Sequence, residues 1–162
     1  MRWDCFAEGL SAEHLRDYLK RLPDFEDFEA ETKALDLVKS HESVLHGLAF
    51  LVNWPALDHA ADLVITRTNE LNGDHYEVLT PSAEALSARH PLAATMCLRA
   101  MIDFALEKAR SSRYQHAARH LMECESLAHS IEDFGPLEDH GTYESRLQSA
   151  HGRKAGFWSR VR

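Results

Sequence analysis

Residues His90 to Ile131 read HPLAATMCLRAMIDFALEKARSSRYQHAARHLMECESLAHSI, and this stretch decides the fold class of the chain. Two densely apolar helical patterns follow one another, and the polar turn at Ser111 and Ser112 separates them. The first pattern is apolar on nearly all sides, which predicts a helix buried against several neighbours. In the second, Tyr114 and Leu121 belong to a wide apolar face that can touch two helices at once. The stretch therefore predicts an antiparallel helical hairpin.

Helical spacing of apolar residues continues on both sides of this hairpin, and β-branched residues never alternate over a useful length. Two segments resemble each other: HAADLV, which begins at His59, and HAARHLM, which begins at His116. Such a repeated segment is typical of stacked helical hairpins. We predict an all-α fold of about seven helices, with antiparallel hairpins stacked as in a tetratricopeptide-like or α-solenoid-type array. Outside the hairpin, the expected helices cover about residues 12–21, 24–40, 42–53 and 55–72. A further helix is expected within 73–90, with a candidate break at Thr80 and Pro81, and a short helix at 142–150.

Length and composition are those of a globular protein. The chain has 162 residues, of which 44% are hydrophobic and 27% charged. This predicts one helical domain over residues 1–150. The N-terminal residues lack the apolar core of a signal peptide, and no apolar run approaches the length of a membrane helix. Three cysteines without paired spacing fit a reducing compartment, so we expect a cytoplasmic protein without membrane contact.

Charge is unevenly distributed along the chain. The total is −8, but residues 145–162 carry five basic residues and no acid, which leaves −13 for residues 1–144. An acidic body does not suit nucleic-acid phosphates. The basic C-terminal tail, 151–162, contains Phe157 and Trp158, and we expect these rings to dock in a groove of this domain or of a partner. The interaction residues that we predict in this tail are Arg153, Lys154, Phe157, Trp158 and Arg160.

A second charged stretch forms the first half of the helix expected at 24–40. Residues 24–31 contain five acids and no base. Acids suit the start of a helix, where the backbone dipole is positive. A solvated face is the simpler interpretation, and a docking surface for a basic partner is the alternative.

His116, His120 and Cys124 lie four residues apart on one stripe of the second hairpin helix. A pair of histidines at this spacing is half of a zinc site. The three together span about 12 Å along the helix axis, so they cannot close on one ion. We therefore predict no metal and no cofactor, with His116 and His120 as the weak metal candidates.

Charged residues also occur within the apolar hairpin. Arg99 and Asp103 are four residues apart on its most apolar helix, where burial requires that each be paired. The order of base before acid is the weaker one in a helix, so a further partner is expected. Glu125 on the following helix is the candidate. We predict a buried polar network of Arg99, Asp103 and Glu125.

Motifs of catalysis are absent from the sequence. It contains no Gly-x-Ser-x-Gly, no Walker-type loop and no dinucleotide-binding glycine pattern. These absences leave enzymatic activity uncertain, and we predict no catalytic residue.

Three segments carry a resemblance to a family of uncharacterised bacterial proteins, some of them labelled as SWIM zinc-finger-associated. The segments are HPLAATMCLRAMID from His90, ARSSRYQHAARHL from Ala109 and HGRKAGFW from His151. With the linking helices, the chain resembles the C-terminal region of that family over about residues 45–158. The resemblance implies a helical-repeat fold and no activity, and the zinc-finger ligands are missing here. The chain is expected to be a short member or a fragment of the longer form.

These observations favour a non-catalytic module of unknown function that binds another protein through a groove. A nucleic-acid-associated accessory protein, touching phosphate with the basic tail alone, is the alternative, and an enzyme of unidentified class is the third hypothesis. The oligomeric state stays open.

Overall fold

The computed structural model of the chain describes residues 2–23 and 25–161, apart from the side chains of Arg2, Asp4 and Cys5. Asp24 in the acidic stretch, Arg162 in the basic tail and the thiol of Cys5 lie outside the described residues. In this part of the chain, helices joined by turns and loops are present and no strand occurs, so the predicted all-α fold class is confirmed.

The chain divides into two compact units, Met1–Glu70 and Leu71–Arg162. The single domain predicted from the sequence therefore stays a prediction. The first unit contains α1 (Arg2–Gly9), α2 (Ala12–Lys20), α3 (Glu26–Lys39), α4 (Val44–Asn53), α5 (Leu57–Thr66) and the 3₁₀ turn η1 (Thr68–Glu70). The second unit contains α6 (Tyr76–Leu86), α7 (Pro91–Glu107), the 3₁₀ turn η2 (Ser111–Arg113), α8 (Tyr114–Ala128), α9 (His140–His151) and α10 (Ala155–Trp158).

In the first unit, aromatic rings join α1 to α4. The rings of Phe6 and Phe50 meet edge to face, with centroids 5.5 Å apart, and both side chains are buried. The predicted helix cap at Ser11 is confirmed, since its hydroxyl oxygen accepts a hydrogen bond from the backbone N–H of His14. Helix α1 itself lies in a stretch where the sequence pattern predicts no helix.

Also in this unit, Arg67 secures the end of α3. Its guanidinium donates to the carbonyl oxygens of Lys39 and His41, at 2.9 and 2.7 Å. The last carbonyls of a helix have no partner within the helix, and Arg67 satisfies them from the end of α5.

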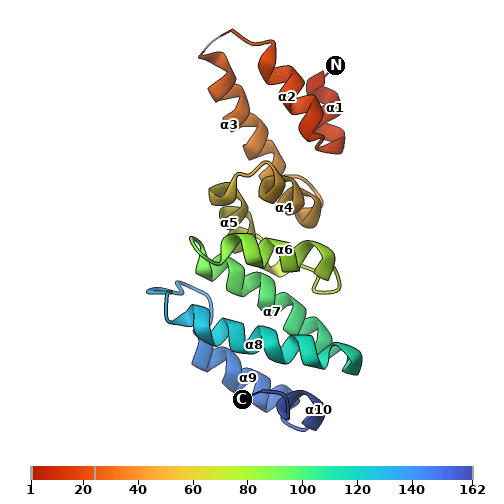
Figure 1. Cartoon of the computed structure of the whole chain (residues 1–162), viewed down its shortest axis with the longest axis vertical. Helices are drawn as coiled ribbons and strands as arrows, with labels where there is room; N and C mark the ends of the chain where they lie inside the picture. The colour runs from red at the N-terminus through yellow and green to blue at the C-terminus, as the bar shows by residue number, and fades with distance from the viewer. Residues whose placement is uncertain (1, 24, 162) are drawn as a thin grey trace. The chain divides into compact units, whose positions relative to one another are not determined.

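Helix α7 forms the centre of the second unit. Eleven of its 17 residues are buried, because α6 packs on one side of it and α8 on the other. Figure 1 shows α6, α7, α8 and α9 side by side in chain order within this unit. The predicted turn at Ser111 and Ser112 is η2. The fold of this unit is thus built around the hairpin that the sequence identifies.

No break occurs in α6 at Pro81, so the candidate break at Thr80 and Pro81 is wrong. A proline inside a helix removes one hydrogen bond and costs about 3 kcal/mol. Buried Leu79, Ala83 and Leu86 lie on both sides of Pro81. Their packing against α7 keeps the helix continuous.

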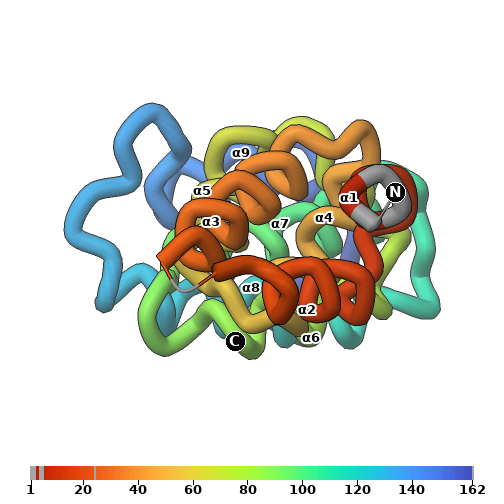
Figure 2. The backbone as a smooth tube through the Cα atoms, turned by 90° about the horizontal axis from the view of Figure 1, so that it is seen from above, coloured from red at the N-terminus to blue at the C-terminus, as the bar shows by residue number. Residues whose placement is uncertain are grey.

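The connection between α8 and α9, residues 129–139, projects beyond the helices (Figure 2). It returns to the helices at Asp139, whose carboxylate accepts a hydrogen bond from the backbone N–H of Thr142 at 2.8 Å and thereby caps α9. This cap places α9 beside α8.

Replacing Gly73 by Ala is expected to lower the free energy of unfolding by about 1–3 kcal/mol, the usual cost of overpacking. A Cβ atom at this position overlaps the carbonyl oxygen of Ala100 and lies 2.6 Å from Cβ of Phe104 on α7. The matched control is Gly141→Ala in α9, where the nearest neighbour of a Cβ atom is 3.7 Å away. Urea denaturation followed by circular dichroism compares the two. Equal stability of the two variants contradicts the close approach at Gly73.

Candidate functional site

A groove of about 860 Å³ runs between α6 and α8 in the second unit. Its floor is apolar and includes Met101 and Ala105 of α7 and Ala117 of α8. The volume lies within the range of ordinary ligand sites in proteins. The tight packing of α6 and α8 against α7 creates the groove, because the side chains of the two outer helices form its walls.

One end of the groove is formed by Arg113, the last residue of η2. Its guanidinium lies between two aromatic rings, 5.4 Å from the centroid of Tyr76 and 5.1 Å from that of Phe104. It also pairs with the carboxylate of Asp74 at 2.8 Å. One terminal nitrogen of Arg113, Nη1, is buried and has no hydrogen-bond partner among the described residues. The ring of Tyr76 is 58% exposed, which leaves an aromatic surface open at this end.

His116 and His120, the weak metal candidates, lie on the α8 wall of the same groove. Arg119 donates a hydrogen bond to Nδ1 of His116 at 2.7 Å. Burial, reinforced by Arg119 and His116, lowers the pKa of His120 to about 4. Among the side chains that the structure describes, no three of His, Cys, Asp or Glu form a group suited to a metal ion. A guanidinium between the two histidines opposes a bound cation there.

Carboxylates face each other across the groove. Glu84 stands on α6 and Glu123 on α8. Burial raises the pKa of Glu123, Arg119 lowers it and the negative charge of Glu84 raises it again. Glu123 makes no hydrogen bond to His120, because its Oε1 is 3.8 Å from Nδ1 of His120, which is too far. Two carboxylates thus lie above the apolar floor in the middle of the groove, with the Arg119 guanidinium near one of them.

A buried polar cluster lies on the opposite side of α7 and is built around Arg99, which is only 6% exposed. Its guanidinium is 4.4 Å from the ring centroid of Tyr143 on α9 and donates to the carbonyl oxygen of Glu138 at 2.8 Å. The hydroxyl of Tyr143 donates to the carboxylate of Asp103 at 2.7 Å. Burial lowers the pKa of Arg99 and raises the pKa of both Asp103 and Tyr143.

The third member of this cluster differs from the sequence prediction. Glu125 is exposed on α8, and Tyr143 of α9 takes the place predicted for it. One residue earlier on α8, Cys124 is buried and interacts electrostatically with Arg99. Helical spacing predicts which residue of α8 faces Arg99 only to within about one position. It gives no information on which residue of α9 lies there. The available signal in the sequence was the pair Tyr143 and Leu147, four residues apart in the helix expected at 142–150.

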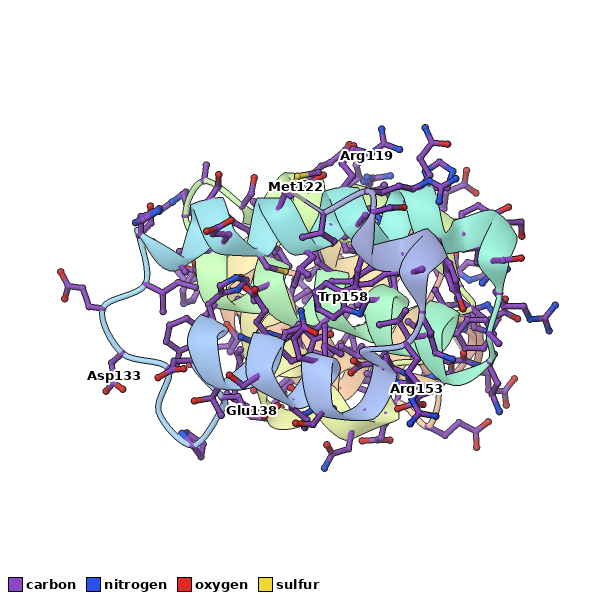
Figure 3. All side chains as sticks on the ribbon, turned by 90° about the horizontal axis from the view of Figure 1, so that it is seen from below. Arg119, Met122, Asp133, Glu138, Arg153 and Trp158 are labelled. Atoms are coloured by element: carbon purple, nitrogen blue, oxygen red, sulfur yellow. The ribbon has the colours of Figure 1, made fainter. Side chains whose placement is uncertain are left out.

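The predicted interaction residues of the tail divide into buried and exposed groups. Phe157 is fully buried in α10, and its ring meets that of Tyr114 edge to face, with centroids 6.2 Å apart. Trp158 is half-buried, and its indole N–H donates to the carbonyl oxygen of His151 at 2.9 Å. Figure 3 shows Trp158 between α8 and α9, on the face of this unit that is seen from below.

The basic members of that set lie outside this packing. Arg153 and Arg160 are exposed and Lys154 is half-buried. Arg160 donates a hydrogen bond to the carbonyl oxygen of Gly156 within α10 and its cap. Figure 3 shows Arg153 near the end of α9, on the same face as Trp158. Arg153 and the indole ring of Trp158 thus lie on one face, and Arg153 and Lys154 line the same hollow.

The fold and the groove together define a small all-α protein whose neighbouring helices pack in sequence within each unit. The model of a protein family described as a family of unknown function, DUF6880, matches residues 1–160. The chain belongs to this family. The match extends to the N-terminal side of the range 45–158 that carries the resemblance, and it shows neither a zinc-finger association nor a C-terminal placement in a longer protein. No curated protein and no solved structure matches the chain significantly. In the described part of the chain, none of the helices combines the length and the apolar character of a membrane span.

Proposed function

We propose that this protein is a non-catalytic protein-binding module, and that the α6–α8 groove holds a segment of the partner that carries a basic side chain. The observation that carries the proposal is the pair Glu84 and Glu123 across an apolar floor. Grooves between helices commonly bind peptide segments through apolar contacts, and charge complementarity selects the partner. The sequential packing of hairpins within each unit also favours the helical-repeat scaffold class.

The charges that line the groove support a basic occupant. Of its two arginines, Arg113 pairs with Asp74, whereas Arg119 donates a hydrogen bond to His116 and lowers the pKa of Glu123. The Glu84 side chain has no ion pair among the described residues. A lysine or arginine of the partner, placed between Glu84 and Glu123, reduces the repulsion between these two carboxylates. Its apolar neighbours then contact the floor and the exposed ring of Tyr76.

Two further features are consistent with this function. The thiols of Cys97 and Cys124 are free and buried, and burial raises the pKa of each to about 12. They behave as small apolar core residues, which suits a protein of the reducing cytoplasm. Fixed helices that are covered on both sides, as α7 is, hold the walls of the groove in place.

A phage-displayed library of random 12-residue peptides tests the proposal. Wild-type protein is expected to enrich peptides with Lys or Arg next to an apolar residue. The double substitution E84K/E123K is expected to weaken the selected peptides at least tenfold, because loss of each close charge pair costs about 1.5 kcal/mol or more. Binding is measured by fluorescence anisotropy of labelled peptides.

Glu125→Lys is the matched control, because Glu125 is exposed on α8 and does not line the groove. It is expected to bind the same peptides as wild type. Enrichment of acidic peptides, or an equal loss for E125K, contradicts the groove proposal. Binding of a labelled DNA duplex at low salt that E84K/E123K leaves unchanged or strengthens, without peptide enrichment, favours the nucleic-acid alternative instead.

A further inference from the structure

Two phenylalanines at the start of α3 are exposed to solvent. Phe25 is 91% exposed and Phe28 is 75% exposed. Phe25 also has a backbone φ of 80°, in the left-handed region that residues other than glycine rarely adopt. Covering two neighbouring exposed phenyl rings with another surface removes apolar area from water, which lowers the free energy. We call residues 25–29 the acidic aromatic hook.

The charge of the hook indicates what kind of surface covers it. Glu26, Asp27 and Glu29 are all exposed, and none of these carboxylates forms an ion pair among the described residues. Asp27 accepts only a local hydrogen bond from the backbone N–H of Phe28. The partner surface must therefore be basic and must offer an apolar contact to the two rings.

The second unit of the same chain carries such a surface. A hollow of about 430 Å³ at the end of α9 is lined by residues 148–154, which include Arg153 and Lys154. Arg160 is exposed, and the half-buried indole of Trp158 lies on the face shown in Figure 3. We call Arg153, Lys154, Trp158 and Arg160 the basic end face. It combines three cations with an aromatic ring, which complements three carboxylates and two phenyl rings.

We propose that the acidic aromatic hook of one molecule docks on the basic end face of a second copy of this chain. The occupant is a second copy because this chain supplies the complementary charges and rings. The two surfaces are different, so the contact is heterologous: in a pair of molecules, one keeps its end face free and the other keeps its hook free for further copies. The inference is independent of the α6–α8 groove, because none of the hook or end-face residues lines it.

Sedimentation velocity over about 1–300 µM tests the contact, since that range covers the affinity of weak self-association. The weight-average mass of wild type is expected to rise with concentration above the 18.4 kDa of the single chain. The variant F25S/F28S, which keeps every charge of the hook, is expected to stay at the mass of one chain. A wild-type mass that remains at 18.4 kDa over the whole range overturns the proposal.

Charge reversal of the two surfaces identifies the contact. The hook variant E26K/D27K/E29K and the end-face variant R153E/R160E are each expected to sediment as single chains. Mixed in equal amounts, they present opposite charges to each other again, and association is expected to return. Failure of the mixture to associate overturns the pairing of these two surfaces.

The matched control E8K/D17K/E42K changes the net charge as much as the hook variant, at three exposed acids outside the hook. It is expected to associate as wild type does. Phe25→Gly separates binding from folding, because glycine adopts a φ of 80° without strain. Its melting temperature is expected to be no lower than that of wild type, while its association weakens. A control triple variant that sediments as a single chain contradicts a specific hook.

Discussion

Replacing Tyr143 by Ala is expected to lower the free energy of unfolding by about 3–5 kcal/mol, as for other buried aromatic residues. The Tyr143 side chain is fully buried and joins α9 to α7. Its ring also covers the guanidinium of Arg99 at 4.4 Å. The substitution therefore removes apolar packing, a cation–π contact and the hydrogen bond to Asp103 in one step. Urea denaturation monitored by far-ultraviolet circular dichroism measures the loss.

Tyr143→Phe divides this effect into its parts. The phenyl ring keeps the packing and the contact with Arg99, and only the hydrogen bond to the carboxylate of Asp103 is lost. An unsatisfied partner of a charged hydrogen bond costs about 1–3 kcal/mol. We expect Tyr143→Phe to lie between wild type and Tyr143→Ala. A loss below about 1 kcal/mol for the alanine variant means that α9 contributes little to the unit, and it contradicts the central role of this ring.

The second large effect is a dependence of stability on pH that arises from His120. Its pKa falls from the ordinary value of 6.5 in the unfolded chain to about 4 in the folded protein. A lowered pKa in the folded state means that the unfolded chain takes up the proton first as the pH falls. The contribution of neutral His120 to stability is thus complete above about pH 6.5 and is lost as the pH falls towards 4. The side chain is only 13% exposed, so the expected loss is on the order of 3 kcal/mol.

The groups that face His120 determine how this dependence is measured. On α8 they are His116, Arg119 and Glu123, and on α6 the groove is lined by Glu84. Other carboxyls titrate in the same range, so the quantity compared is the difference between wild type and His120→Gln from pH 7 to pH 4. We expect this difference to shift against wild type as the pH falls.

His129→Gln is the matched control, because His129 is exposed at the end of α8. It is expected to keep the wild-type pH profile. A His120→Gln variant whose stability falls in parallel with that of wild type contradicts the burial of a neutral imidazole at this position. The raised pKa of Asp103 acts in the opposite direction, because a protein whose carboxyl group has a raised pKa in the folded state gains stability as the pH falls. This contribution is the same in wild type and in both variants, so it does not affect the comparison.

Local sequence signals predicted the helices well where the pattern was long and capped. Ser11 begins α2, and the hairpin of α7 and α8 turns at Ser111 and Ser112 as expected. Two short helices, α1 and α10, were not predicted. Helix α10 has four residues, and its Phe157 needs the surface of α8 to be buried. A helix of that length gains little from its own hydrogen bonds, so its existence depends on tertiary packing.

In the candidate site, too, local spacing predicted the residues of one helix but not the residues that other helices bring to it. The spacing of His116 and His120 placed them on one stripe of a helix, and the structure has both on the α8 wall of the groove. The spacing did not indicate Glu84, which reaches Glu123 from a helix about forty residues earlier in the chain. Likewise, the pairing of Arg99 with Tyr143 joins residues 44 apart, and no local pattern specifies which helix covers α7 there.

The sequence by itself determined the all-α class, the central hairpin of α7 and α8, and the presence of a buried arginine that requires partners. Helical periodicity and the cost of burying charge are properties of neighbouring residues, so they can be calculated from order along the chain. Only the tertiary structure decided that Tyr143 satisfies Asp103, that Glu84 faces Glu123 across a groove, and that Phe25 and Phe28 stay exposed. Each of these depends on which helices pack together, and packing brings together residues whose distance in sequence carries no information about their contact.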